Sequence, residues 1–257
     1  MNNSYWDDYN RRIYEQEHMQ VSLEHRGFRC GYNEEMVSLR FKILEKYCRG
    51  KRVADLGCGT GSYLIPLAKI TKEIVGVDFS RNMLNTLQTK LNNQPHNSIQ
   101  IYHENIKNIS LETASFDVVY SIATLYYVSD VGKVVLEMNR ILKKGGIAIF
   151  ELGNLWSLNT IITRKAPTGV KSFHVSLGRM YKIIKQAKFR ILKHRAFQLL
   201  PMQSGPIYLL PLVSSKWKII MSKKIKERML DEIMSSSFLF KHLAFRHLFV
   251  CQKEETT

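Results

Sequence analysis

Three glycines and two aspartates between residues 55 and 78 form the part of the sequence best suited to hold a ligand. The segment Val-Ala-Asp55-Leu-Gly57-Cys-Gly59-Thr-Gly61 has glycine at every second position, directly after an apolar run typical of a buried strand. Glycine permits positive φ and lets a ligand lie against the main chain, and a helix that begins there offers N–H groups. Asp78 ends the next apolar run. A carboxylate in that place can accept hydrogen bonds from both ribose hydroxyls, so the pattern predicts a nucleoside site.

The spacing of the glycines distinguishes between nucleotide ligands. A dinucleotide fingerprint reads G-x-G-x-x-G, and its third glycine would fall on Ser62 here. The sequence instead reads G-x-G-x-G, with an acid two residues before the first glycine. A G-x-x-x-x-G-K-[ST] phosphate loop is absent as well. A nicotinamide dehydrogenase and a P-loop enzyme are therefore disfavoured.

Short apolar runs that alternate with amphipathic segments must position these residues. This alternation predicts an α/β fold with a parallel sheet covered by helices on both faces. The predicted strands are 52–56, 74–77, 99–102, 116–121 and 147–152, followed by 190–197 and 245–253. The predicted helices are 34–47, 63–70, one capped by Ser80, 131–142 (closed by Lys143-Lys-Gly-Gly146), 177–187 and 217–234.

Four motifs in order resemble the class I S-adenosylmethionine-dependent methyltransferases, and within them the type 11 group. They are Asp55-Leu-Gly-Cys-Gly-Thr-Gly61, Val-Gly-Val-Asp78-Phe79-Ser80, Phe116-Asp-Val-Val and Lys-Lys-Gly145-Gly146. The resemblance implies a Rossmann-like, doubly wound sheet of seven strands, mostly parallel with an antiparallel last strand. It covers about residues 50–197 and the last predicted strand, in a domain expected over 51–257. Residues 201–240, between the last two predicted strands, look like an insertion that would form a substrate cap. Residues 1–50, with aromatic residues at 5, 6, 9 and 14, would form an N-terminal helical lid.

The resemblance assigns a role to each matching position. S-adenosyl-L-methionine would lie with its methionine part on the glycine turn and its ribose on Asp78. Phe79 and Met83 would flank the adenine, and Asn105 would offer a neutral oxygen to the adenine amine in place of the family's common acid. Ser121 and Ile122 would border the transferring methyl group. The full set of expected cofactor-binding residues is Asp55, Gly57, Cys58, Gly59, Gly61, Asp78, Phe79, Met83, Asn105, Ile106 and Ser121.

The implied reaction is methyl transfer to O, N or C of a small organic acceptor, including an anionic one. An activated methyl group needs no metal, and we expect no metal site. A phenol or alcohol acceptor needs a general base. Ligands of open α/β sheets lie outside the carboxyl ends of the strands. The candidate bases there are Tyr126, Tyr127 and Glu151. His174, just before the helix predicted at 177–187, is another candidate, and the sequence does not choose among the four.

The uneven charge keeps other readings open. The chain of 257 residues has a net charge of +16. Residues 161–257 hold 19 Lys and Arg against 5 Asp and Glu, a net of +14. Such a basic part attracts nucleic acid, anionic lipid or an anionic substrate. An RNA methyltransferase acting on tRNA or rRNA is thus the alternative function, and a cofactor-binding domain that acts through a partner is a third.

Location and assembly are only weakly constrained. The four cysteines form no Cys-x-x-Cys pair, which suits a reducing compartment. No apolar run has the length of about 20 residues that a spanning helix needs. We expect a cytoplasmic protein without a membrane span, either monomer or homodimer.

Overall fold

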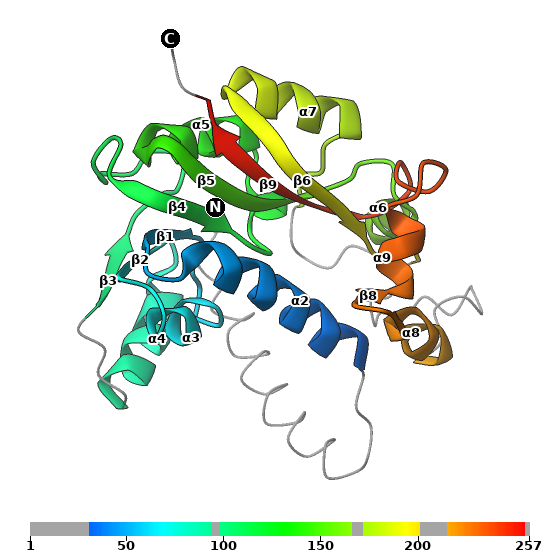
Figure 1. Ribbon diagram of the computed structural model, residues 1–257, viewed down its shortest axis with the longest axis horizontal. Helices are drawn as coiled ribbons and strands as arrows, with labels where there is room; N and C mark the ends of the chain where they lie inside the picture. Colours follow the sequence, from blue (N-terminus) through cyan, green and yellow to red (C-terminus); the bar gives the residue numbers. More distant parts are fainter. Residues whose placement is uncertain (1–30, 94–97, 166–171, 201–214, 255–257) are drawn as a thin grey trace.

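The computed structural model describes residues 31–93, 98–165, 172–200 and 215–254. A seven-stranded sheet runs through it in the order β3-β2-β1-β4-β5-β9-β6 (Figure 1). The strands are β1 Arg52–Leu56, β2 Glu73–Asp78, β3 Ile99–His103, β4 Phe116–Ser121, β5 Leu142–Gly153, β6 Phe189–Phe197 and β9 Arg246–Lys253.

The sheet has the direction pattern expected of the family. The strands β1 to β5 pair in parallel, whereas β9 pairs antiparallel to both β5 and β6. The predicted doubly wound sheet with an antiparallel last strand is therefore confirmed. The chain order reverses between β1 and β4, and ligands of such sheets bind at this switch point.

Helices cover both faces of the sheet. The helices are α2 Gly31–Cys48, α3 Leu64–Ala68, α4 Arg81–Asn93, α5 Val131–Ile141, α6 Leu158–Lys165, α7 Leu177–Gln186, α8 Ser215–Ser222 and α9 Leu230–Ser235, with a 3-10 turn η1 at Leu125–Tyr127. Within the described residues, no helix is both long and apolar enough to cross a bilayer.

Successive residues of a strand pack into two separate hydrophobic cores, one on each face of the sheet, because side chains alternate across a strand. Val53 and Val118 pack on the face covered by α2, α3 and α4. Their neighbours Ala54 and Val119 pack on the opposite face, under α5 and α7. Burial on both faces explains why the strands read as continuous apolar runs in the sequence.

Two predicted helices differ from the structure. The helix from Val131 ends at Ile141, and Lys143 to Gly146 belong to the start of β5. Leu142 pairs there with Phe116 of β4, with a register shift before the next pair, and Gly145 takes a positive φ of 69°. Pairing with β4 therefore converts the expected helix cap into strand.

The helix predicted over 217–234 is also wrong. The structure has α8, then a two-stranded ribbon of β7 (Lys224–Ile225) and β8 (Arg228–Met229), then α9. The break lets α9 begin at Leu230, so that the buried carboxylate of Asp231 accepts hydrogen bonds from the backbone N–H groups of Gln198 and Leu199, at 2.7 and 3.0 Å. The predicted lid residues before 31 and the cap residues 201–214 lie outside the described part of the chain.

Candidate active site

A glycine corner joins β1 to α3 and is packed too closely for a larger residue. Gly57 takes a φ of +84° and donates its N–H to the carbonyl of Val77 at 2.7 Å. A Cβ on Gly57 would lie 2.2 Å from Cγ2 of Thr124. The Thr124 hydroxyl also donates to the carbonyl of Gly57 at 3.1 Å. The corner is thus fixed between β2 and the segment that follows β4.

Asp78 ties the corner to the end of β2. Its Oδ2 accepts the N–H of Gly59 and its Oδ1 accepts the N–H of Ser80, both at 2.9 Å. An ionised carboxylate has about four acceptor positions. Because Asp78 also accepts a backbone hydrogen bond from Phe79, one position is open to a hydroxyl donor from a ligand. Burial raises the pKa of Asp78, and the backbone hydrogen bonds oppose that rise.

Asp55 lies beneath the corner as a second carboxylate. The side chain is buried, and its Oδ2 accepts the hydroxyl of Tyr120 at 2.8 Å. Burial raises the pKa of Asp55 to about 8, the negative charge of Asp78 adds to the rise, and the bond from Tyr120 opposes it. A ligand that carries positive charge would favour the ionised forms of these two carboxyl groups.

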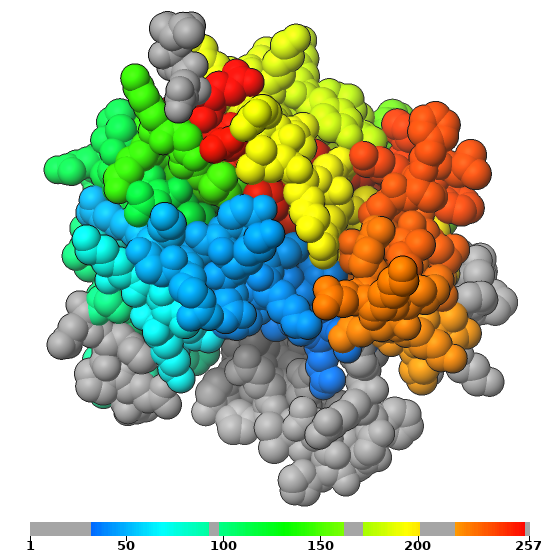
Figure 2. Space-filling model, viewed as in Figure 1, coloured from blue at the N-terminus to red at the C-terminus, as the bar shows by residue number. Residues whose placement is uncertain are grey.

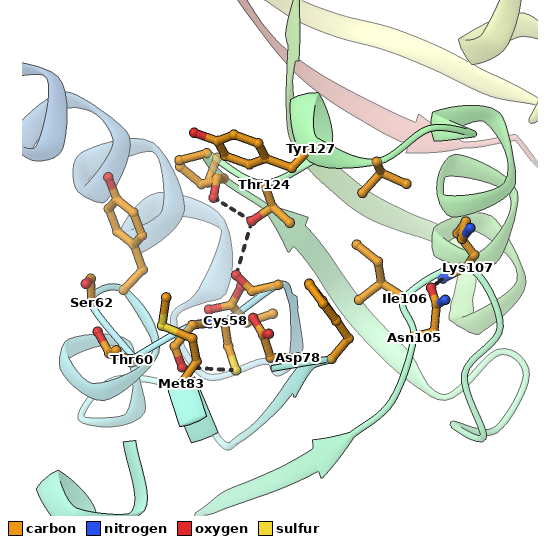
Figure 3. Close-up of a pocket in the computed structure, with 18 of the residues that line it drawn as sticks. Cys58, Thr60, Ser62, Asp78, Met83, Asn105, Ile106, Lys107, Thr124 and Tyr127 are labelled. Atoms are coloured by element: carbon orange, nitrogen blue, oxygen red, sulfur yellow. Dashed lines mark hydrogen bonds between the residues drawn. The ribbon is translucent and has the colours of Figure 1, made fainter. Parts of the chain in front are cut away.

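A cavity of about 600 Å³ opens above these groups at the carboxyl ends of β1, β2 and β4 (Figure 3). Its floor carries the two carboxylates, and Phe79, Met83 and Ile106 supply apolar walls. Hydroxyl groups of Thr124 and Tyr127 occupy the opposite wall. The cavity therefore combines an acidic floor, an apolar slot and a hydroxyl-bearing side.

The structure brings nine of the eleven expected cofactor residues to this wall. They are Asp55, Gly57, Cys58, Gly59, Asp78, Phe79, Met83, Asn105 and Ile106. Asn105 is exposed at the rim, where its Oδ1 accepts the N–H of Lys107 at 3.1 Å. Its amide can still meet a ligand, because a carbonyl oxygen has a second lone pair.

The other two expected residues lie outside the wall. Ser121 is fully buried, and its hydroxyl donates to the carbonyl of Leu56 at 2.7 Å, which ties β4 to β1. Gly61 allows close packing, since a Cβ there would lie 2.5 Å from Cδ1 of Leu87. Both residues hold the corner in shape rather than line the cavity.

Sequence reasoning missed several wall residues. They are Thr60, Ser62, Tyr63, Lys107, Ala123, Thr124, Val128 and Ser129. Most adjoin a predicted residue in the chain, so extending each motif by a few positions would have found them. Among them, Tyr63 connects the cavity wall to α2, because it interacts electrostatically with Arg40 of that helix.

Glu151, a candidate base, is held in a buried ion-pair cluster. Arg40 donates to its two oxygens at 2.7 and 2.9 Å, and the Nη1 of Arg246 lies 3.5 Å from Oε2. Burial would raise the pKa of Glu151, but the charges of Arg40 and Arg246 and the bond from Arg40 outweigh it, so the pKa is lowered. A carboxylate so engaged is poorly suited to remove a proton from an acceptor.

Two further candidate bases, Tyr126 and His174, also lie outside the cavity wall. Tyr126 is buried, and its hydroxyl accepts a hydrogen bond of 2.6 Å from Nη1 of Arg246. The Nδ1 of His174 lies 2.9 Å from the hydroxyl of Thr160, and the ring packs edge-on against Phe245. Of the tyrosines after β4, it is Tyr127 that lines the cavity.

Comparison with known proteins agrees with this geometry. Residues 54–150, which include the corner, Asp78 and the wall after β4, match the family described as "Methyltransferase domain". The match covers less than half of the chain. The same part of the chain resembles a demethylmenaquinone methyltransferase from Bacillus pumilus, with 35% identity over 104 residues. A second such enzyme, from Staphylococcus saprophyticus, is 38% identical over 103 residues. Each match covers 39% of this chain and 44% or 43% of the relative, so the chain spans less than half the length of these curated relatives.

Solved structures of methyltransferases share the fold of this chain over most of its length. An S-adenosylmethionine-dependent methyltransferase from Mesorhizobium loti has a TM-score of 0.59 at 18% identity, covering 83% of this chain and 96% of that one. The magnesium protoporphyrin IX methyltransferase of Synechocystis, solved with bound SAH, has a TM-score of 0.58 at 15% identity, covering 87% and 84%. At such identities the likeness concerns the fold.

Proposed function

We propose that this protein is an S-adenosylmethionine-dependent methyltransferase that transfers a methyl group to O, N or C of a small organic acceptor. The observation that carries the proposal is the position of Asp78, whose carboxylate ties the glycine corner to β2 and keeps acceptor capacity toward a cavity of about 600 Å³. A cavity of this size suits a nucleoside-sized ligand.

The residues of the cavity fit this cofactor. Asp78 would receive a ribose hydroxyl, and the corner from Gly57 to Gly59 would lie against the methionine part. Phe79 and Met83 would enclose the adenine. When bound, S-adenosylmethionine supplies a methyl group activated by a sulfonium charge. A sulfonium charge beside Asp55 and Asp78 would favour the ionised form of both carboxyl groups, and the packed corner would hold the ligand in one orientation.

The acceptor would enter beside the segment after β4. Ala123, Thr124 and Tyr127 form that side of the cavity. The cluster of Arg40, Glu151 and Arg246 behind it carries one excess positive charge in a buried place, which supports an acceptor that is anionic or becomes so on reaction. The names of the two curated relatives support a small organic acceptor rather than RNA.

Isothermal titration calorimetry on the purified chain tests the proposal. We expect S-adenosylmethionine and S-adenosylhomocysteine to bind the wild type with one site. Asp78→Ala should weaken both by at least about tenfold, because it removes a charge-assisted hydrogen bond worth about 1.5–3 kcal/mol. The exposed carboxylate of Glu112 lies outside the cavity wall, so Glu112→Gln serves as the control. Unchanged affinity in Asp78→Ala would refute the assignment.

A further inference from the structure

The turn between α9 and β9 exposes apolar side chains that the cavity does not use. Phe238 and Leu239 are 89% and 76% exposed, and Phe240 and Leu243 follow at 39% and 40%. We call residues 238–243 the apolar turn. A soluble domain rarely presents so many large apolar groups together, and such a patch marks a surface that meets a partner or a membrane.

Trp156 lies beside the apolar turn and enlarges it. Asn154 donates from Nδ2 to the carbonyls of His242 and Ala244, at 2.7 and 3.0 Å. The Oδ1 of Asn154 accepts the N–H of Trp156, whose side chain is 62% exposed. The turn after β5 and the apolar turn are thus pinned together, next to α6 (Figure 1).

A strongly basic surface borders the apolar turn. The 75 residues from Leu152 to Lys226 include 15 Lys and Arg and no Asp or Glu. Lys241, within the turn, lies 5.9 Å above the ring of Tyr181 on α7. The same helix presents exposed basic side chains at Lys182 and Lys185. The orange-red segment that contains the apolar turn lies at the surface in Figure 2. The cations that the structure places beside the turn are thus Lys241 and those of α7.

We propose that the apolar turn and its basic border form a docking surface for an anionic lipid bilayer. Lipid headgroups complement the cations of the turn and of α7, and each cation near such a surface increases binding about fivefold. Aliphatic and aromatic side chains at a protruding turn can both enter the headgroup and acyl boundary. Stacking on bases would use the aromatic side chains but not Leu239 and Leu243, so a lipid surface makes use of the whole patch.

This inference does not rest on the methyltransferase activity, so it can be tested on the full chain without turnover. We would measure co-sedimentation with vesicles of phosphatidylcholine, with and without phosphatidylglycerol, at low and high salt. We expect binding to the anionic vesicles that weakens with salt and little binding to phosphatidylcholine alone. In addition, the fluorescence of Trp156 should shift to the blue with anionic vesicles, and Trp156→Phe should remove that shift.

Paired variants identify the surface. The double variant F238S/L239S should lower the partition onto anionic vesicles by at least about tenfold, whereas V37S/L136S, at exposed apolar positions of α2 and α5, should leave it unchanged. Each double variant should keep the melting temperature and the affinity for S-adenosylmethionine of the wild type.

A second pair of variants tests the charge. Lys182→Gln with Lys185→Gln should weaken binding by roughly tenfold or more, and Lys69→Gln with Lys72→Gln, at exposed sites beside α3, should not. Three results would overturn the inference. The first is absence of vesicle binding by the wild type. The second is equal binding by F238S/L239S and its control. The third is a wild-type dimer that F238S/L239S dissociates, which would show that a second copy covers the turn.

Discussion

Replacing Asp55 with asparagine should stabilise the ligand-free protein, and more so as the pH rises. Burial raises the pKa of Asp55 to about 8 in the folded protein, whereas an aspartate in an unfolded chain titrates near about 3.9. Between these values the folded state holds a proton that the unfolded state has released. The free energy of unfolding therefore falls as the pH rises through this window, because the folded state must either keep its proton or bury a charge.

The size of the effect follows from the width of the window. Each pH unit corresponds to about 1.4 kcal/mol, so the contribution of Asp55 falls by about 2.7 kcal/mol between pH 5 and pH 7. Asparagine keeps an oxygen that can accept the hydroxyl of Tyr120, which Asp55 accepts at 2.8 Å, and it has no proton to lose. The variant should thus gain about 2.7 kcal/mol on the wild type over the same interval.

Urea unfolding at pH 5, 6 and 7 measures this difference directly. Groups elsewhere titrate equally in both proteins, so they cancel in the comparison. A stability difference that grows with pH supports the buried, protonated carboxylate. Parallel pH profiles for the two proteins would show that Asp55 is ionised throughout and that its environment is more polar than the geometry indicates.

Three further predictions concern the same region. Gly57→Ala should lower the free energy of unfolding in urea by about 2–3 kcal/mol, because its Cβ would meet Thr124 at 2.2 Å. Gly59→Ala, whose Cβ would have no atom within 4 Å, should lower it by only about 1 kcal/mol, and equal losses would contradict the packing argument. Glu151→Gln should cost about 3–5 kcal/mol, since it leaves two arginine charges buried without a counter-charge; a loss under about 1 kcal/mol would mean that solvent reaches them. Binding of S-adenosylmethionine at pH 7 should release a proton from Asp55, seen as a dependence of the heat on buffer ionisation, and S-adenosylhomocysteine, which lacks the sulfonium charge, should release less.

The sequence predicted the elements whose causes are local. Strands β1 and β4 have the predicted bounds 52–56 and 116–121, because a short β-rich apolar run between turn signals is enough to define a buried strand. The glycine corner was predicted for the same reason. Positive φ at Gly57, Gly59 and Gly61 is a property of the residue type itself.

Elements that depend on distant partners were not predicted. The segment 217–234 has helical periodicity, yet it breaks so that Asp231 can satisfy two N–H groups beyond the end of β6 and accept the hydroxyl of Tyr32 at 2.6 Å. Tyr32 and Asp231 lie 199 residues apart. Local propensity gives way there, since two unsatisfied buried N–H groups and a buried charge would cost more than a broken helix.

Glu151 shows how a correct rule about a fold can still misplace a function. The rule that ligands meet the carboxyl ends of parallel strands correctly places Glu151 at that end of β5. The rule does not specify which side chains from other elements contact Glu151 there. Arg40 comes from α2, 111 residues away, and Arg246 comes from the start of β9. The charge of the Glu151 carboxylate is therefore already paired with two guanidinium groups and is not available to an acceptor. The same two arginines leave one positive charge in excess over Glu151, and we propose that this charge favours an anionic acceptor. Chemistry at the cavity is therefore left to the groups that line it, of which the hydroxyl of Tyr127 is the first to test if the acceptor proves to be a phenol.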